Sequence, residues 1–213
     1  MKKLLLLSLA LASATNAAMA ANSVDLRVTG TITPAACNIT MTGGDFDLGT
    51  ISASALSASE ETRLPLIRGR TLEIHCAGAQ QVGFKAIDNR KDEKSSSSSY
   101  GLGRDGANNP IGNYYIHFII SSVLADGTGG KLKYSWDSGN DWDTATALHG
   151  MRNSDVDVYA FDTATSNNIE APLPLTSGSV ELLLAAFVQP LSNLDASAEI
   201  TIDGSATIEL VYL

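Results

Sequence analysis

The chain has 213 residues, with 14 Lys+Arg against 23 Asp+Glu and a formal net charge of −9 at pH 7. An acidic protein repels nucleic acid and anionic lipid surfaces, so we expect neither as a partner. The length suits one domain, or one domain with a long insertion.

Residues 1–20 are predicted to be a secretory signal peptide. Two lysines follow the first methionine, residues 4–12 form a short apolar run, and Ala18-Met19-Ala20 supplies the small residues that signal peptidase requires. The apolar run is too short to span hydrocarbon. No later segment is both apolar and long enough to do so. We therefore expect an exported, soluble protein that has no stable membrane insertion.

Residues 21–33 form an alternating segment that ends before a proline. One face carries Val24, Leu26, Val28 and Ile32, and Gly30 takes the fourth place in that row. Such a segment either pairs within its own sheet or is a free arm that adds a strand to another molecule. The pattern leaves both arrangements open.

Two cysteines, Cys37 and Cys76, lie in the exported part of the chain. Disulfides form and persist outside the cytoplasm, and two cysteines allow one intramolecular pairing. Free thiols or a metal pair are the alternatives. No Cys/His cluster completes a zinc site, so we predict the disulfide and no metal.

Most of the remaining chain has an apolar period of two. The runs are residues 72–76, 114–120, 131–136, 156–161 and 200–212, while residues 180–188 are apolar on both faces, as a central strand of a sandwich would be. The turn-rich pieces between the runs include residues 126–130, 137–140 and 176–178. Several short strands separated by turns predict an all-β sandwich over residues 34–213. Residues 88–112 are polar and rich in Ser and Gly, so we expect them to form a long surface insertion.

The last run alternates strictly. Its apolar positions are Ile200, Ile202, Ala206, Ile208, Leu210 and the penultimate Tyr212. An exposed strand edge of this kind invites the addition of another strand, which natural proteins usually prevent. We therefore expect this exposed edge to pair with a strand from another molecule.

These features together resemble a chaperone–usher fimbrial subunit. The resemblance is carried by the signal peptide, the alternating arm, the stretch TLEIHC that ends at Cys76, and Tyr212. The stretches PAACNITMTGGDFDLGTIS and QVGFKAIDNR look like an uncharacterised branch of fimbrial-like exported proteins. The resemblance spans nearly the whole mature chain.

The resemblance implies an immunoglobulin-like β-sandwich that lacks its last strand. A periplasmic pilus chaperone would fill the resulting groove, and an outer-membrane usher would pass the subunit to a neighbouring pilus subunit. Val24, Leu26, Val28 and Ile32 would then be the inserted side chains, and Gly30 would fit where the groove is narrow. The groove edge would consist of Ile202, Ala206, Ile208, Leu210 and Tyr212. The resemblance also implies that the protein is located in a fimbrium at the cell surface and contributes to cell adhesion.

The sequence favours no enzymatic activity and no cofactor. The string Gly101-Leu-Gly103-Arg-Asp-Gly106 matches a dinucleotide-binding pattern but has no βαβ unit around it. The acidic residues near position 140 match no EF-hand spacing, and Trp136 and Trp142 either pack the core or stack on a sugar. The alternative to a fibre subunit is a monomeric, self-complemented exported protein that binds a ligand such as a glycan.

Overall fold

The structure is a computed structural model that describes residues 26–31, 36–94 and 99–213. The described part contains strands and short 3-10 turns but no α-helix. None of its segments is a helix of the length and apolarity that a membrane crossing needs. The predicted signal peptide, residues 1–20, lies outside the described residues.

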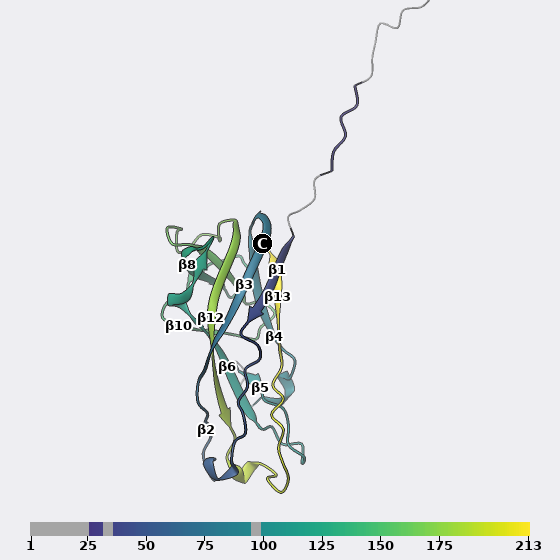
Figure 1. Ribbon diagram of the computed structural model, residues 1–213, viewed down its shortest axis with the longest axis vertical. Helices are drawn as coiled ribbons and strands as arrows, with labels where there is room; N and C mark the ends of the chain where they lie inside the picture. Colours follow the sequence, from purple (N-terminus) through teal and green to yellow (C-terminus); the bar gives the residue numbers. More distant parts are fainter. Residues whose placement is uncertain (1–25, 32–35, 95–98) are drawn as a thin grey trace, which may run out of the picture. The chain divides into compact units, whose positions relative to one another are not determined.

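Thirteen strands of the described residues pair into one large, continuous sheet that folds into two layers (Figure 1). The strands are β1 (Cys37–Thr42), β2 (Thr62–Arg63), β3 (Ile67–Gln80), β4 (Val82–Asp88), β5 (Tyr100–Gly101), β6 (Gly112–Ile119), β7 (Leu124–Ala125), β8 (Thr128–Ser135), β9 (Asp143–Thr144), β10 (Leu148–Met151), β11 (Val158–Thr163), β12 (Leu175–Val188) and β13 (Ala206–Tyr212). The 3-10 turns are η1 (Ala53–Ala55), η2 (Lys91–Glu93), η3 (Ile120–Ser122) and η4 (Leu191–Asn193).

The sheet follows the order β1-β3-β12-β7-β8-β11-β4-β13, and β6 pairs with the other part of β12. Every ladder between named strands is antiparallel. One layer contains β1, β3, β12 and β6, and the other contains β8, β11, β4 and β13. The prediction of an all-β sandwich is thus confirmed.

A two-residue turn carries the chain from one layer to the other. Asp126 and Gly127 connect β7 to β8, and both have positive φ angles, of 48° and 76°. Such angles are those of the tight hairpin turn that matches the natural twist of the strands. The Asp126 carboxylate also accepts hydrogen bonds from the backbone N–H groups of Thr176 (2.9 Å) and Ser177 (2.8 Å) on β12. The Thr176 hydroxyl also donates to this carboxylate (2.6 Å). This hydroxyl contributes most to holding the pKa of Asp126 below its ordinary value, and the two N–H groups add to the effect.

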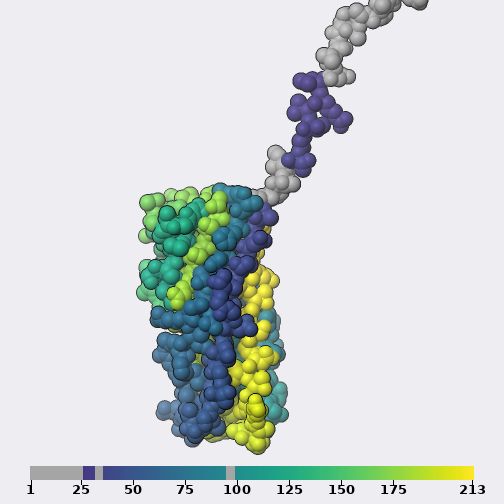
Figure 2. Space-filling model, in the orientation of Figure 1, coloured from purple at the N-terminus to yellow at the C-terminus, as the bar shows by residue number. Residues whose placement is uncertain are grey.

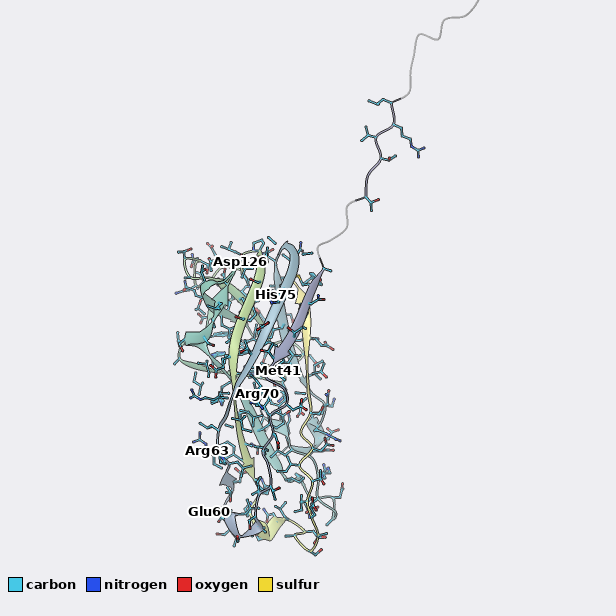
Figure 3. The ribbon with its side chains drawn as sticks, viewed as in Figure 1. Met41, Glu60, Arg63, Arg70, His75 and Asp126 are labelled. Atoms are coloured by element: carbon cyan, nitrogen blue, oxygen red, sulfur yellow. A yellow bond between two sulfur atoms is a disulfide. The ribbon has the colours of Figure 1, made fainter. Side chains whose placement is uncertain are left out.

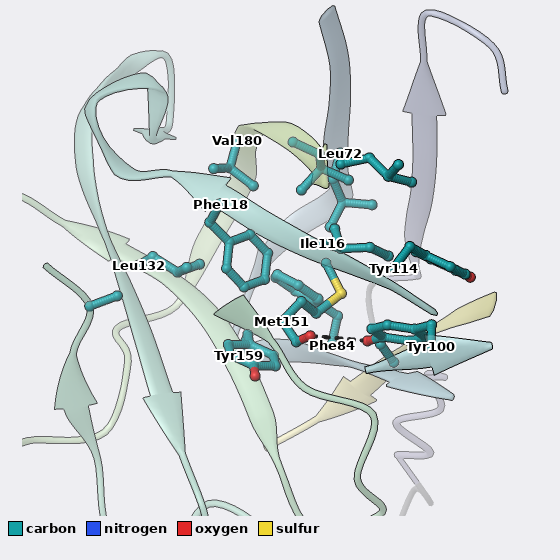
Figure 4. Packing of buried hydrophobic residues seen from close by; sticks show 14 of the residues in the cluster. Leu72, Phe84, Tyr100, Tyr114, Ile116, Phe118, Leu132, Met151, Tyr159 and Val180 are labelled. Carbon is teal, nitrogen blue, oxygen red and sulfur yellow. Dashed lines mark hydrogen bonds between the residues drawn. The ribbon is translucent and has the colours of Figure 1, made fainter. Parts of the chain in front are cut away.

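The core lies between the two layers and is rich in aromatic rings (Figure 4). Phe118 of β6 packs 5.0 Å from Tyr159 of β11 and 5.8 Å from Phe84 of β4, measured between ring centroids. Gly178 of β12 leaves room for the Phe161 ring of the opposite layer, because a Cβ there would lie 2.2 Å from a ring carbon. Residues 176–178, predicted as a turn, are therefore part of β12, where a small residue is needed for packing.

Residues 88–112 were predicted to be a surface insertion, and this prediction is wrong for the part of the segment that is buried. Tyr100 is fully buried, and its ring stacks 5.1 Å from that of Tyr114. Leu102 and Ile111 are also buried, and β5 pairs with β6. The Ser- and Gly-rich composition concealed a few apolar residues that fill one end of the sandwich.

Candidate functional site

The sheet has two ends, β1 and β13, and these are the candidate site. Among the described residues β1 pairs along one side with β3, and β13 pairs along one side with β4. The two strands lie side by side, purple and yellow in Figure 1, but no ladder joins them. The backbone N–H of Cys37 donates a hydrogen bond of 3.2 Å to the Tyr212 hydroxyl, which links the two edges at one point. The outer side of each edge strand is therefore left without a ladder partner.

The segment that includes β13 carries a row of half-buried apolar side chains. Four of the predicted groove-edge residues pack partly against the core, namely Ile202, Ala206, Ile208 and Leu210. The fifth, Tyr212, is 56% exposed. Ile200 and Ile202 precede the strand, because β13 begins only at Ala206. The alternation predicted over residues 200–212 is thus a strand in its second half alone.

The opposite edge was missed by the sequence reasoning. Half-buried apolar side chains follow β1 and the segment after it, at Cys37, Ile39, Phe46, Leu48 and Ile51. The spacing of two between Cys37 and Ile39, and again between Phe46 and Leu48, was the available signal. Figure 2 shows this dark blue segment beside the yellow C-terminal segment along one face of the molecule.

The backbone next to these side chains is poorly paired. Residues 43–51 and residues 195–202 make no backbone–backbone hydrogen bond with another described residue. The side chain of Arg70, labelled on β3 in Figure 3, holds the first of these segments instead. Its guanidinium donates to the carbonyl oxygen of Asp45 (Nε–O 3.0 Å) and lies 5.5 Å from the centre of the Phe46 ring. Both segments retain backbone groups that an added strand can pair with.

The predicted disulfide fixes one of the two edges. Cys37 and Cys76 are bonded with an S–S distance of 2.00 Å, and they are direct cross-strand partners in the register of β1 with β3. The bond thus joins the first residue of the edge strand to the interior of the sheet. The prediction of this pairing is confirmed.

The predicted donor-strand residues are only partly within the described chain. Residues 26–31 form no regular secondary structure, and Leu26 and Val28 are 89% and 88% exposed. A Cβ added at Gly30 would have no atom within 4 Å. Val24 and Ile32 lie outside the described residues. The insertion of this segment into another subunit remains a prediction.

The two tryptophans have different environments. Trp142 is buried beside Val158 and Ala160, and its indole N–H donates to the carbonyl of Gly139 (2.9 Å). Trp136 is 38% exposed, and the guanidinium of Arg152 lies 4.5 Å from its ring centre. Core packing therefore holds for Trp142, while Arg152 covers the ring of Trp136 on which a sugar would stack.

The acidic patch near position 140 is a turn. The Asp137 carboxylate accepts hydrogen bonds from the Ser135 hydroxyl (2.6 Å) and from the backbone N–H of Asp141 (2.9 Å). The N–H of Asp141 contributes most to holding the pKa of Asp137 below its ordinary value. In the part of the chain that is described, no group of three or more His, Cys, Asp or Glu side chains is placed to hold a metal ion.

Sequence comparisons relate the chain to proteins of similar length. Residues 26–116 match a family described as "Protein of unknown function (DUF1120)". The chain is 26% identical to "Uncharacterized protein YhcF" of Escherichia coli (strain K12), over 92% of this chain and 93% of that protein. It is 25% identical to "Protein GltF" of the same organism, over 96% of this chain and 94% of that protein. The similarities to the two full-length relatives cover both edges of the sandwich.

Proposed function

We propose that this chain is a structural subunit of a bacterial surface fibre that is assembled by chaperone–usher donor-strand exchange. The observation that carries the proposal is the pair of sheet ends, β1 and β13, each with half-buried apolar side chains and one unpaired side. A sandwich whose sheet ends in this way is suited to accept one more strand between the two edges. The resemblance of the sequence to fimbrial-like exported proteins supports this role.

The N-terminal segment has the pattern of the strand that would be donated. Burial of an aliphatic side chain that is otherwise in water is worth roughly 1.5–3 kcal/mol before ordering costs are subtracted. Leu26 and Val28 are almost fully exposed, so they have nearly all of this free energy still to gain. Main-chain hydrogen bonds along the added strand would fix its register.

The contact that results would join two different surfaces. The donated segment precedes the disulfide, whereas the accepting edges belong to the sandwich. A contact between unlike surfaces does not close on itself as a two-fold dimer does, so repetition builds a filament. A protein that displays such a contact would be exported, held by a periplasmic chaperone, and passed through an usher to the cell surface.

The test is expression of the exported chain in an oxidising compartment, with and without a pilus-type chaperone. Native mass spectrometry and thiol titration then measure complex formation and the state of the two cysteines. We expect a 1:1 complex of the chaperone with the disulfide-bonded subunit, and a folded but less stable, self-associating subunit in its absence. A stable monomer that needs no chaperone and forms no polymer would overturn the proposal and favour a self-complemented binding protein.

Two matched pairs of variants separate the accepting and donating roles. Ile208→Asp places a charge on the core-facing side of β13, and Thr207→Asp places the same charge on the exposed side of that strand. Only Ile208→Asp should abolish the chaperone complex. In the donated segment, Val28→Asp should leave the chaperone complex intact but abolish polymer formation, whereas Thr29→Asp should permit both. A polymer formed by Val28→Asp would contradict the donor role without depending on how the sandwich folds.

A further inference from the structure

A hollow of about 520 Å³ lies at the end of the sandwich remote from the disulfide. It opens beside η4 and the segment before β6, near the lower end of Figure 3 where Glu60 is labelled. The hollow is a shallow depression that is largely open to solvent. The hollow lies apart from β1 and β13 themselves, and Asp195 is the one lining residue that belongs to the segment leading to β13.

The walls of the hollow are held in place by backbone hydrogen bonds. The N–H of Gln189 donates to the carbonyl of Ile111 (2.9 Å), and that of Leu191 donates to the carbonyl of Ser57 (3.0 Å). Both bonds fix the start of the turn that carries the lining residues Ser192, Asn193 and Leu194. The side chain of Gln189 also donates to the Glu61 carboxylate (2.7 Å). The backbone of this wall is therefore held in place without a ligand.

A buried carboxylate joins the two sides of the hollow. Asp105 is 7% exposed and accepts hydrogen bonds from the backbone N–H groups of Asn109 and Asp195, both at 2.7 Å. It also accepts from the Asn109 carboxamide (3.0 Å). Asn109 and Asp195 both line the hollow, so Asp105 ties the segment before β6 to the segment after η4.

The lining combines polar side chains with a smaller but substantial apolar surface. Its polar side chains are three carboxamides, one hydroxyl and one carboxylate: Asn109, Gln189, Asn193, Ser192 and Asp195. Pro110 and Leu194 supply the apolar part. A carboxamide both donates and accepts hydrogen bonds, as a hydroxyl group does. No Lys, Arg or His lines the hollow, so a phosphate or carboxylate ligand would find a carboxylate without a compensating cation.

We propose that this hollow binds a neutral, hydroxyl-rich carbohydrate. Vicinal hydroxyl groups of a sugar ring match closely spaced amide donors and acceptors, and Pro110 and Leu194 offer contact for the C–H surface of the ring. The Ser192 hydroxyl donates a long hydrogen bond to the side-chain oxygen of Asn193 (3.3 Å). The Asn193 amide donates another long one to the side-chain oxygen of Gln189 (3.4 Å). A sugar can therefore replace these contacts with shorter ones.

Saturation-transfer NMR on the purified exported chain tests this inference. The probes are galactose, mannose, N-acetylglucosamine and lactose, with N-acetylneuraminic acid as the anionic comparison. We expect saturation transfer to at least one neutral sugar and none to the anionic one. Transfer to no neutral sugar, or stronger transfer to the anionic sugar, would overturn the proposal.

Variants that fill the hollow make the test specific to this site. Asn193→Leu and Ser192→Leu replace exposed polar residues on η4, and each should lower the affinity for the sugar about tenfold or more. Asn140→Leu changes an exposed asparagine in a turn outside the hollow and should leave the affinity unchanged. Thermal unfolding shows whether each variant is folded. Unchanged affinity in a folded Asn193→Leu and a folded Ser192→Leu would refute the site. Sugar binding in a chain that never polymerises would leave this inference intact while the fibre proposal fails.

Discussion

Strands β12 and β13 differ in what surrounds them, although both are rich in apolar residues. β12 has β3 along one side and β6 and β7 along the other, and its Leu182 and Ala186 are fully buried. β13 has β4 along one side, and its Ile208 and Leu210 are half-buried. An apolar pattern thus indicates which face of a strand packs against other residues. The number of neighbouring strands determines how far its side chains are buried in the isolated chain.

The largest expected loss of stability comes from removing the disulfide that ties the edge strand β1 to β3. Replacing both Cys37 and Cys76 by Ser removes a bond across 39 residues of chain. In the chain-entropy account this lowers the free energy of unfolding by about 4 kcal/mol. Urea denaturation of the oxidised protein and of the double variant measures the difference. A loss under about 1 kcal/mol would mean that β1 is held by its ladder alone.

A matched pair of truncations compares the closed and open sides directly. Leu182→Ala should lower the free energy of unfolding by about 2–5 kcal/mol, because it empties a fully enclosed volume. Ile208→Ala should cost the isolated chain only about 1 kcal/mol, because the side chain is already partly in water.

A chaperone strand added beside β13 should change the cost of one of these two substitutions. The cost of Ile208→Ala should then rise toward that of Leu182→Ala, because the added strand completes the burial of Ile208. Denaturation of the chaperone-bound subunit checks this result. Equal costs in the isolated chain would show that the face of β13 is already closed.

A smaller effect concerns the end of the sandwich that contains Asp105. The backbone N–H of Asp195, together with the Asn109 side chain and backbone N–H groups, lowers the pKa of Asp105 to about 2 from an ordinary 3.8. A lowered pKa means that the folded state binds the proton less tightly than the unfolded state does. The stabilisation is therefore complete above pH about 4 and is lost as the pH falls toward about 2.

Thermal unfolding measured across that acid range checks the prediction. Asp105→Asn should have a lower midpoint than the native chain at neutral pH and a flatter dependence on pH below about 4. An identical pH dependence in the two proteins would show that Asp105 is not the group that titrates.

The strands were largely predictable from sequence, because period-two patterns are local. The runs at 72–76 and 180–188 lie within strands, and those at 114–120 and 131–136 extend past β6 and β8 by one residue each. Burial was harder to predict. Tyr100 lies among serines and glycines, and its stacking on Tyr114 depends on a partner that is close only in the folded chain.

The two edges show why the site was half predicted. The run before β13 looks like more strand, yet Asp203 donates its N–H to the carbonyl of Leu102 (3.0 Å), and a Cβ on Gly204 would lie 2.8 Å from the Tyr114 ring. The chain therefore leaves the ladder in order to pack against the segment around Leu102. The β1 edge was missed because Gly43 and Gly44, both with positive φ angles, interrupt its alternation.

The turn between β7 and β8 has a consequence for chemical ageing. Asp-Gly bonds are prone to rearrange, because the bare glycine lets its nitrogen attack the preceding carboxyl group and form a succinimide. The chain has three such pairs, which begin at Asp105, Asp126 and Asp203. The first two carboxylates are occupied by N–H groups of distant segments, whereas the exposed Asp203 side chain contacts Arg90.

We therefore expect isoaspartate to accumulate first at Asp203 when the folded protein is stored. Peptide mapping after prolonged incubation measures the rearrangement at each pair, and faster conversion at Asp126 would contradict this order. Rearrangement at Asp203 adds a methylene group to the main chain three residues before β13 begins. The oldest molecules would then carry a displaced edge strand, so the durability of any assembly that uses this edge would be limited by one aspartate outside the strand.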